Sequence, residues 1–312
     1  MDALSDVLSL LKLRSYASGG FEMGGDWSIR FSAYEGIKCY AVVSGQCWLA
    51  LDGEAEPVLL TAGDCFLLPR GRPFRLASDL SLPSIDASTI TPATRNGNIV
   101  SWNGGRDFLG VGGHFALAAN HASLLLGVLP SIVHIRKESD RAALRWSLER
   151  MRLELRERQP GGFLVAQHLA SMLLVQALRL YLAEGVSGGV GWLFALADKQ
   201  MSAAINALHA DPAHRWTLQE LAGHAGMSRS TFALRFKETV GEAPMEYLTR
   251  WRMLLAGDRL LNSREAVSTI ALSLGYESDS AFSTAFKRVM GCSPRQYGRG
   301  QEPVPTSAVT AG

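Results

Sequence analysis

One spacing pattern occurs twice in the C-terminal third of this 312-residue chain. The pattern is F-x-x-x-F-K-x-x-x-G-x-x-P-x-x-Y, and it covers residues 232–247 and 282–297 without a slip. A short apolar segment that ends in glycine precedes each copy, over residues 218–226 and 267–275. Two copies of helix, tight turn and helix predict a pair of helix-turn-helix units.

The second helix of each unit, expected over 229–240 and 279–290, should have one buried and one outward face. Phe232, Phe236 and Val240 recur at i, i+4 and i+8 and predict the buried stripe of the first copy. An ordinary solvated helix face is the alternative for the opposite side, but two matched copies argue against it. We interpret the small outward side chains as candidates for reading base edges: Ser230, Ala233, Leu234, Ser280, Ser283 and Thr284. Candidates for phosphate contacts flank them: Ser228, Arg229, Lys237, Ser278, Lys287 and Arg288.

A single helix from Pro244 to Leu261 is expected to join the two units. A packed helix of this length would hold both reading helices on one side of DNA, about one helical turn or ~34 Å apart. The formal net charge is only +2, so any basic surface must be local. We expect arginines on the joining and reading helices to supply it: Arg229, Arg235, Arg250, Arg252, Arg259, Arg288 and Arg295.

The N-terminal half predicts a β-barrel built from short strands. Aromatic and β-branched residues alternate with turn signals such as Asp52-Gly53 about every eight residues. We also expect a short amphipathic helix over Met1–Arg14 and a loop over Ser81–Asn103. The expected strands are Trp27–Phe31, Lys38–Val43, Gln46–Leu51, Val58–Leu60, Phe66–Pro69, Phe74–Leu76 and Phe108–Leu117.

Two helices follow the barrel, and a third opens the C-terminal region over Trp192–Ala210. Arg141–Arg158 is amphipathic, whereas Phe163–Ala183 is apolar around most of its circumference. The apolar helix must be covered, either by packing under the barrel or by a dimer interface, and the sequence leaves both open. Polar residues such as Gln167 and Arg179 interrupt it, so a membrane span is not expected.

The chemistry-bearing side chains form no catalytic or metal-binding pattern. His114, His121 and His134 have irregular spacing, and structural roles are expected for them. The cysteines have no CxxC pair, and we interpret Cys39, Cys47, Cys65 and Cys292 as reduced structural thiols. Oxidant sensing by Cys39, Cys47 or Cys65 stays open as an alternative. The N-terminus does not have the pattern of a secretory signal, so a cytoplasmic location is expected.

The C-terminal hundred or so residues closely resemble the DNA-binding domain of the AraC/XylS family of bacterial transcription regulators. Besides the doubled pattern, the matching residues are Leu221-Ala222 with Gly226-Met227-Ser228, Tyr247–Met253, and Ile270-Ala271 with Gly275-Tyr276. The resemblance implies promoter DNA and RNA polymerase as partners and a role as an activator. Family members commonly carry Arg where this chain has Leu234 and Thr284, so base readout here is expected to differ from theirs.

The N-terminal half resembles the cupin-type sensor domain attached to a subset of that family, with Gly45, Trp48, Gly63-Asp64 and Pro69-Arg70-Gly71 in matching order. Cupin enzymes hold a metal with His and Glu, including a His where this chain has Phe74, and residues 37–40 offer no HxH pair. Neither a metal nor a cofactor is therefore expected, and a cupin enzyme is the least favoured alternative. The resemblance implies a cavity for a small effector, with Tyr40, Trp48 and Phe66 as candidate lining residues.

Taken together, the sequence predicts a two-domain α+β chain: a cupin-like β-barrel with following helices, and an all-α double helix-turn-helix domain. We expect a cytoplasmic, non-enzymatic transcription regulator whose cupin-like domain senses a small molecule or forms a homodimer. The expected segments are 1–117 for the sensor, 118–184 for a helical dimerisation or linker region, 185–191 for a flexible linker, 192–300 for DNA binding, with helix-turn-helix units at 218–240 and 267–290, and 301–312 for a disordered tail.

Overall fold

The computed structural model describes residues 2–11, 14–90, 95–96, 98–116, 129–136, 138–157, 159–183 and 189–299. The chain divides into two compact units, one of residues 12–186 and one that combines residues 1–11 with 187–312. The expected sensor segment 1–117 therefore differs from the structure at its start, because the first eleven residues group with the C-terminal helices. Most of the expected linker 185–191, the whole tail 301–312 and His121 lie outside the described residues.

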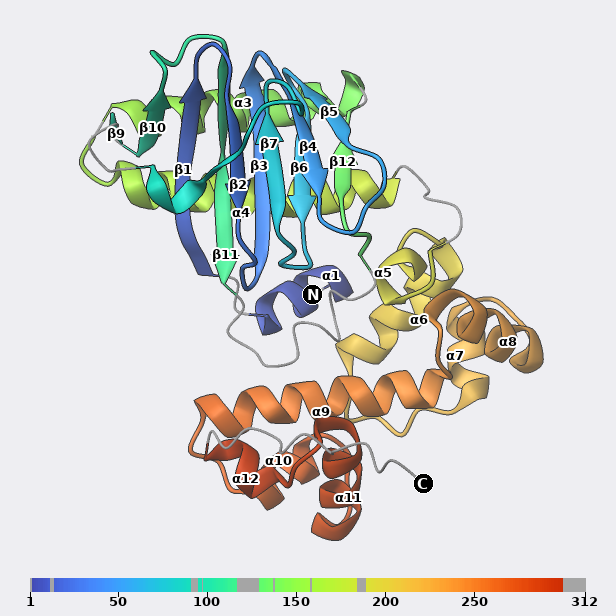
Figure 1. Ribbon diagram of the computed structural model, residues 1–312. Helices are drawn as coiled ribbons and strands as arrows, with labels where there is room; N and C mark the ends of the chain where they lie inside the picture. The colour runs from blue at the N-terminus through green and yellow to red at the C-terminus, as the bar shows by residue number, and fades with distance from the viewer. Residues whose placement is uncertain are drawn as a thin grey trace, which may run out of the picture. The chain divides into compact units, whose positions relative to one another are not determined.

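In the described part of unit 12–186, the strands form two sheets that enclose an apolar interior (Figure 1). One sheet has the order β12-β6-β3-β11-β1-β10-β9, and the other has the order β5-β4-β7-β2-β8. Every expected strand is present, with described ends that shift by at most one residue. The strands are β1 Arg14–Met23, β2 Ser28–Phe31, β3 Ile37–Ser44, β4 Gln46–Leu51, β5 Val58–Thr61, β6 Cys65–Leu68, β7 Phe74–Ala77, β8 Ile85–Asp86, β9 Arg95–Asn96, β10 Ile99–Trp102, β11 Phe108–Ala116 and β12 Val133–Ile135.

Strand β1 is the main element that the sequence does not predict. It pairs antiparallel with β11 and parallel with β10, and Gly20 lies opposite both Val111 and Ile99. A Cβ atom at Gly20 would lie 2.9 Å from the Gly110 carbonyl oxygen, so the close approach of the two strands requires glycine here. The loop expected over Ser81–Asn103 is wrong in part. This segment contains the short strands β8, β9 and β10 and the 3-10 helix η1 Ala87–Thr89.

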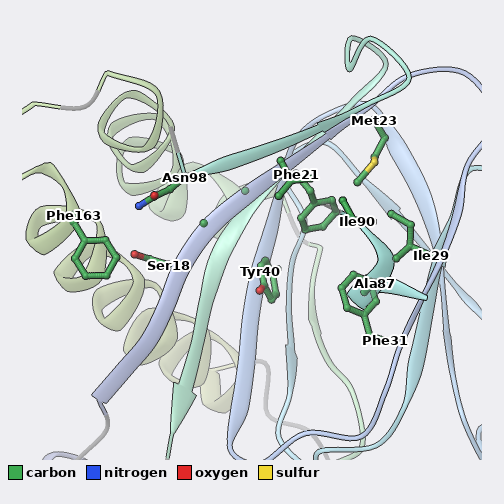
Figure 2. Close-up of a pocket in the computed structure, with 13 residues that line it drawn as sticks. Ser18, Phe21, Met23, Ile29, Phe31, Tyr40, Ala87, Ile90, Asn98 and Phe163 are labelled. Atoms are coloured by element: carbon green, nitrogen blue, oxygen red, sulfur yellow. The ribbon is translucent and has the colours of Figure 1, made fainter. Parts of the chain in front are cut away.

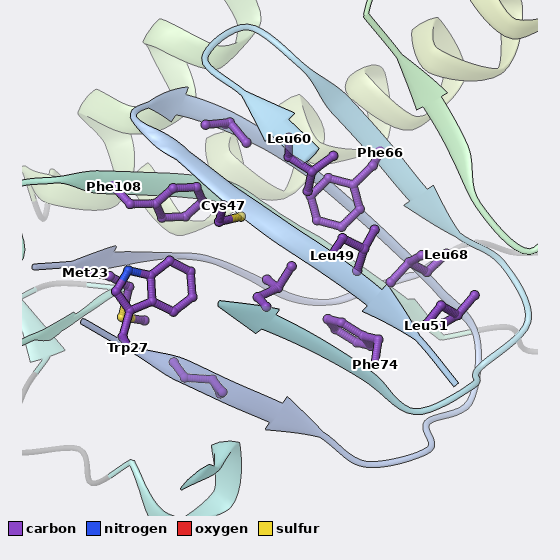
Figure 3. Close-up of a cluster of buried hydrophobic side chains, with 13 residues drawn as sticks. Met23, Trp27, Cys47, Leu49, Leu51, Leu60, Phe66, Leu68, Phe74 and Phe108 are labelled. Atoms are coloured by element: carbon purple, nitrogen blue, oxygen red, sulfur yellow. The ribbon is translucent and has the colours of Figure 1, made fainter. Parts of the chain in front are cut away.

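Apolar side chains from both sheets fill the interior of the barrel (Figure 3). Phe66 on β6 and Phe74 on β7 come from opposite sheets, and each is 2% exposed. Trp27 and Phe108 extend the same cluster, with ring centroids 5.3 Å apart. Burying one such side chain contributes roughly 1.5–3 kcal/mol, which makes this cluster the main support of the unit.

Helices α3 Glu138–Arg156 and α4 Gly162–Ala183 pack on each other and on the sheet that contains β1 (Figure 1). Leu169, Leu173 and Leu174 of α4 are buried in this packing. Of the two open alternatives for the apolar helix, packing under the barrel accounts for its buried face. Helix α4 is long and apolar enough to span a membrane, but nine of its residues are buried within the protein.

The other unit is helical in its described part, and its long helix α9 Pro244–Asn262 joins two groups of shorter helices. The single helix expected over Trp192–Ala210 is instead two helices, because Asp198 caps α6 by accepting hydrogen bonds from the N–H groups of Gln200 and Met201. Helices α7, α8, α10 and α11 closely follow the expected ranges of the two helix-turn-helix units, whereas no range is expected for the short helix α12. The shorter helices of the two groups are α5 Trp192–Ala195, α6 Lys199–Ala210, α7 Leu218–His224, α8 Arg229–Val240, α10 Val267–Ser273, α11 Asp279–Met290 and α12 Pro294–Gly298.

Helix α1 Ala3–Leu10 packs against α6 and α9 of the same unit. The N–H of Ala3 donates to the Oδ1 atom of Asn206 at 2.8 Å, and Asp6 lies 3.5 Å from the Nδ1 atom of His209. Leu4, Val7 and Leu10 fall at i, i+3 and i+6 and are buried. The N-terminal helix is thus a structural part of the unit that carries the repeated pattern.

Candidate nucleic-acid interface

Helices α7 and α8 form the first helix-turn-helix unit. The hydroxyl of Thr217 accepts the N–H of Glu220, whose carboxylate accepts the N–H of Thr217, so a capping box begins α7. Gly226 has φ +64°, a left-handed value that suits glycine, and ends this helix. Ser228 then caps α8 by accepting the N–H of Thr231.

Helices α10 and α11 form the second unit in the same way, with a turn that is one residue longer. Gly275 has φ +80° and ends α10 as Gly226 ends α7. Ser278 accepts the N–H of Ala281 and caps α11. The chain between the glycine and the cap is Met227 in the first unit and Tyr276-Glu277 in the second. The extra residue lies in the turn, so it leaves the two reading helices α8 and α11 in matching register.

The two reading helices have the same burial pattern at all twelve successive positions. Phe232, Phe236, Phe282 and Phe286 are fully buried, as the sequence predicts. Ser230, Leu234, Ser280 and Thr284 are exposed, and the smaller side chains Ala233 and Ser283 are half-buried beside them. Leu234 is 62% exposed, so its side chain is accessible to a binding partner.

The basic side chains of this unit fall into two groups. Several of the arginines expected to supply the basic surface instead contact groups within the protein. Arg235 pairs with Asp198, Arg250 with Glu242 and Arg259 with Glu265, and Arg252 donates to backbone carbonyl oxygens. Within the described residues, no carboxylate pairs with the exposed cations of the reading helices, Arg229, Lys237, Lys287 and Arg288. These four remain as the phosphate-contacting candidates.

The barrel unit contains a pocket of about 400 Å³ (Figure 2). Tyr40, one of the three expected lining residues, is part of its wall. Phe66 instead lies in the barrel core, and Trp48 of β4 pairs with Leu59 and Ala77 away from this wall. The described lining carries no ionisable acid or base other than the phenol of Tyr40. It consists of Ser18, Gly19, Gly20, Phe21, Met23, Ile29, Phe31, Tyr40, Ala87, Ile90, Asn98, Val100 and Phe163.

Lys38 is a cation held among aromatic rings at the edge of the barrel interior. Its Nζ atom lies 4.2 Å from the ring centroid of Tyr34, 4.7 Å from that of Phe74 and 4.9 Å from that of Phe31. Burial lowers the pKa of Lys38 to about 8. The sequence gives no signal for this arrangement, because Phe74 comes from β7, far along the chain from the segment 31–38 that carries Lys38 and the other two rings.

Comparison with known proteins agrees with both halves of the structure. A cupin family model matches residues 2–183, and a helix-turn-helix domain model matches residues 221–300. An AraC-like transcription regulator of Streptomyces antibioticus is 44% identical over 298 residues, which cover 95% of this chain and 98% of the relative. The transcriptional regulator AlkR of Acinetobacter baylyi is 31% identical, with 95% and 99% of the two chains covered.

The chain belongs to the AraC family of transcription regulators. Among solved structures, the DNA-binding domain of AdpA in complex with a target DNA is 32% identical, covers 33% of this chain and 92% of that one, and has a TM-score of 0.31. The family assignment makes the chain a DNA-binding regulator and not an enzyme, as the sequence predicts.

The cupin half of this AraC-family chain does not fit the metal of a cupin enzyme. Phe74 stands where such enzymes have a His, and the ammonium of Lys38 lies against its ring and would repel a metal ion. Two of the histidines have structural partners: His114 contacts the backbone oxygen of Glu35, and His134 lies 3.2 Å from the carboxylate of buried Asp64. No cluster of metal-ligating side chains occurs in the part of the chain that the structure describes.

Proposed function

We propose that this AraC-family regulator inserts α8 and α11 into successive major-groove segments of promoter DNA. The observation that carries the proposal is the residue-for-residue match in burial between the two helices. In both, aromatic side chains hold the helix in its unit and leave the small outward residues accessible for base edges. The hydroxyl groups of Ser230, Ser280, Ser283 and Thr284 can bond base edges, and the phosphate candidates would position them.

The two reading faces differ in chemistry, so they select different sequences. The outward face of α8 carries Ser230, Ala233 and Leu234, whereas that of α11 carries Ser280, Ser283 and Thr284. The exposed isobutyl group of Leu234 suits contact with a thymine methyl group. The site bound by one subunit is therefore asymmetric. In this proposal the protein acts in the cytoplasm as an activator that contacts RNA polymerase; a relative in Escherichia coli that is 27% identical is named a transcriptional activator.

The proposed role of the barrel unit is to sense a small molecule in the pocket of Figure 2. Its aromatic and aliphatic walls, together with Ser18 and Asn98, favour an uncharged, largely apolar effector with one hydrogen-bonding group. Homodimerisation through the outer face of α3 is a further part of the proposal. Trp146 on that face is 67% exposed and offers a large apolar side chain to a partner subunit.

Effector sensing is favoured over oxidant sensing because the barrel thiols are poorly placed to react. Cys39 and Cys65 have their Sγ atoms 4.0 Å apart, and both side chains are buried. The hydrogen bond to Cys65, together with burial, raises the pKa of Cys39 well above its ordinary value, and burial also raises the pKa of Cys47. The thiolate is the reactive form, so these shifts oppose oxidation.

Footprinting of the full chain on a duplex selected from a randomised library tests the DNA-binding proposal. Two adjacent protected segments of different sequence are expected, about one helical turn apart. Lys237→Ala and Lys287→Ala should each weaken binding, while Lys199→Ala, which changes an exposed lysine on α6 outside both reading helices, should not. Protection of a single segment, or equal effects of all three variants, would contradict the proposal.

A further inference from the structure

The segment before the first helix-turn-helix unit contacts the turn of the second. Residues 211–216 connect α6 to α7, whereas Gly275 lies between α10 and α11. A Cβ atom at Gly275 would lie 2.3 Å from the carbonyl oxygen of Ala213, so the two segments touch at a position that excludes any side chain. The two helix-turn-helix units are thus in contact with each other at a place separate from the helix α9 that joins them.

Arg252 on α9 bonds to one segment and stacks on the other. Its Nη2 atom donates to the carbonyl oxygen of His214 at 2.8 Å, and its Nε atom donates to that of Pro212. Its guanidinium carbon lies 5.7 Å from the ring centroid of Tyr276 in the second turn. The planar guanidinium can make both contacts at once, which the ammonium of a lysine cannot do.

The extra residue of the second turn belongs to the same contact. Tyr276 and Glu277 replace the single Met227 of the first unit, and Glu277 pairs with Arg215 of the connecting segment. Both side chains of that ion pair are more than 70% exposed, so the pair adds little by itself. Half-buried Arg252, with two carbonyl acceptors and an aromatic ring, is the stronger part of the connection.

We propose that Arg252 is a positioning residue that fixes the distance and rotation between the two reading helices, so that the protein selects operators by the spacing of their two halves. Helix α9 packs against helices of both helix-turn-helix units, but this packing links the two units only through α9. The contact anchored by Arg252 joins the two helix-turn-helix units directly and adds a second constraint on the distance and rotation between their reading helices. The proposal rests on the proposed insertion of both α8 and α11 into one duplex.

Base-pair spacing provides the test because each added base pair turns the second half-site by about 35° and moves it about 3.4 Å. The duplex selected by the full-length protein is used as the probe, together with versions that have one base pair inserted or deleted between the protected segments. The wild-type protein should lose on the order of 30-fold in affinity on insertion, as for the loss of one or two good base contacts. Arg252→Met should bind the original duplex somewhat less well but lose only about 3-fold on insertion, because its units can adjust.

Arg250→Met is the matched control, since Arg250 lies on the same helix and pairs with Glu242 near the first unit. It should keep the wild-type response to spacing. Tyr276→Leu, which keeps apolar bulk but removes the aromatic face, should fall between the wild type and Arg252→Met and serves if Arg252→Met fails to fold. The same spacing response in wild type, Arg252→Met and Tyr276→Leu, or equal loosening in Arg250→Met, would overturn the positioning role. A footprint with one protected segment in every protein would instead overturn the two-helix reading of DNA.

Discussion

The hydroxyl of Tyr247 lies 2.7 Å from the Nε2 atom of His209, in the interior of the DNA-binding unit. The imidazole also stacks on Trp251 with ring centroids 4.0 Å apart, and its side chain is fully buried. The carboxylate of Asp6 lies 3.5 Å from the other ring nitrogen, at the edge of hydrogen-bonding distance. One histidine therefore connects α6, α9 and α1.

Mild acid should destabilise the unit through His209. Burial lowers the pKa of His209 to about 3 from an ordinary value of 6.5, so between these two pH values the unfolded chain binds a proton that the folded chain does not. The unfolding free energy must then fall as the pH drops from 6.5 towards 3. From pH 7.5 to 5, urea unfolding of the wild type should lose about 2 kcal/mol more than that of His209→Gln. Parallel losses in both proteins would show that His209 is protonated when folded.

Lysine and threonine on the same reading helix should have different effects on DNA binding. Lys287→Ala should weaken binding to all sequences alike and reduce the slope of log K against log salt by about 1, because it removes a phosphate contact. Thr284→Ala should leave the salt slope unchanged and relax selection at one or two base positions by roughly 1–3 kcal/mol. Binding to a panel of single-base variants at several salt concentrations separates the two. A change of salt slope in Thr284→Ala would contradict its assignment to a base edge.

The doubled aromatic stripe should contribute equally in the two copies. Phe236→Ala and Phe286→Ala each remove a fully buried ring in an equivalent position, and each should cost about 3–5 kcal/mol of stability. Leu234→Ala changes an exposed residue of α8 and should alter stability by less than about 0.5 kcal/mol. Thermal unfolding monitored by circular dichroism provides the comparison. A large difference between the two phenylalanine variants would mean that the units are not energetically equivalent.

Lys38→Met should stabilise the barrel unit in a pH-dependent way. Burial lowers the pKa of Lys38 from 10.5 to about 8, so at pH 7 the folded protein retains a charge that its surroundings disfavour. The wild type is relieved of this cost as the pH rises from 8 to 10.5, because the folded chain releases the proton before the unfolded chain does. The advantage of Lys38→Met in urea should therefore be largest near pH 7 and shrink by pH 10. A variant less stable than the wild type at pH 7 would show that the three aromatic rings outweigh the desolvation.

Elements with strong local signals could be located from the sequence, and elements defined by contacts could not. The capping box of Thr217 and Glu220, the glycine that ends α7 and the Phe232–Phe236 stripe depend on neighbours within one or two turns. Strand β1 has Ser18, Gly19 and Gly20 in its interior and shows no apolar alternation, so its partners β10 and β11 define it. The break between α5 and α6 likewise depends on one cap, Asp198, inside an otherwise helical pattern.

In the candidate site too, features set by the local sequence could be predicted, and features set by contacts between distant segments could not. Exposure of Ser230, Leu234 and Thr284 follows from helical periodicity, and the structure has these side chains on the outward face. The ion pairs that occupy Arg235, Arg250 and Arg259 depend on the arrangement of separate helices, so counting arginines overestimates the basic surface. Tyr40 but not Phe66 lines the pocket, because strand register decides which aromatic side chain faces a cavity and which fills the core.

The position of α1 also sets an order of events during synthesis. Ala3 and its partner Asn206 are 203 residues apart, so α1 packs against helices that are synthesised well after it. At about 5–20 residues per second, α1 waits roughly 10–40 s for its partners. The barrel between them has time to fold first. The core that α1 shares with α6 and α9 therefore forms only after the barrel has been synthesised.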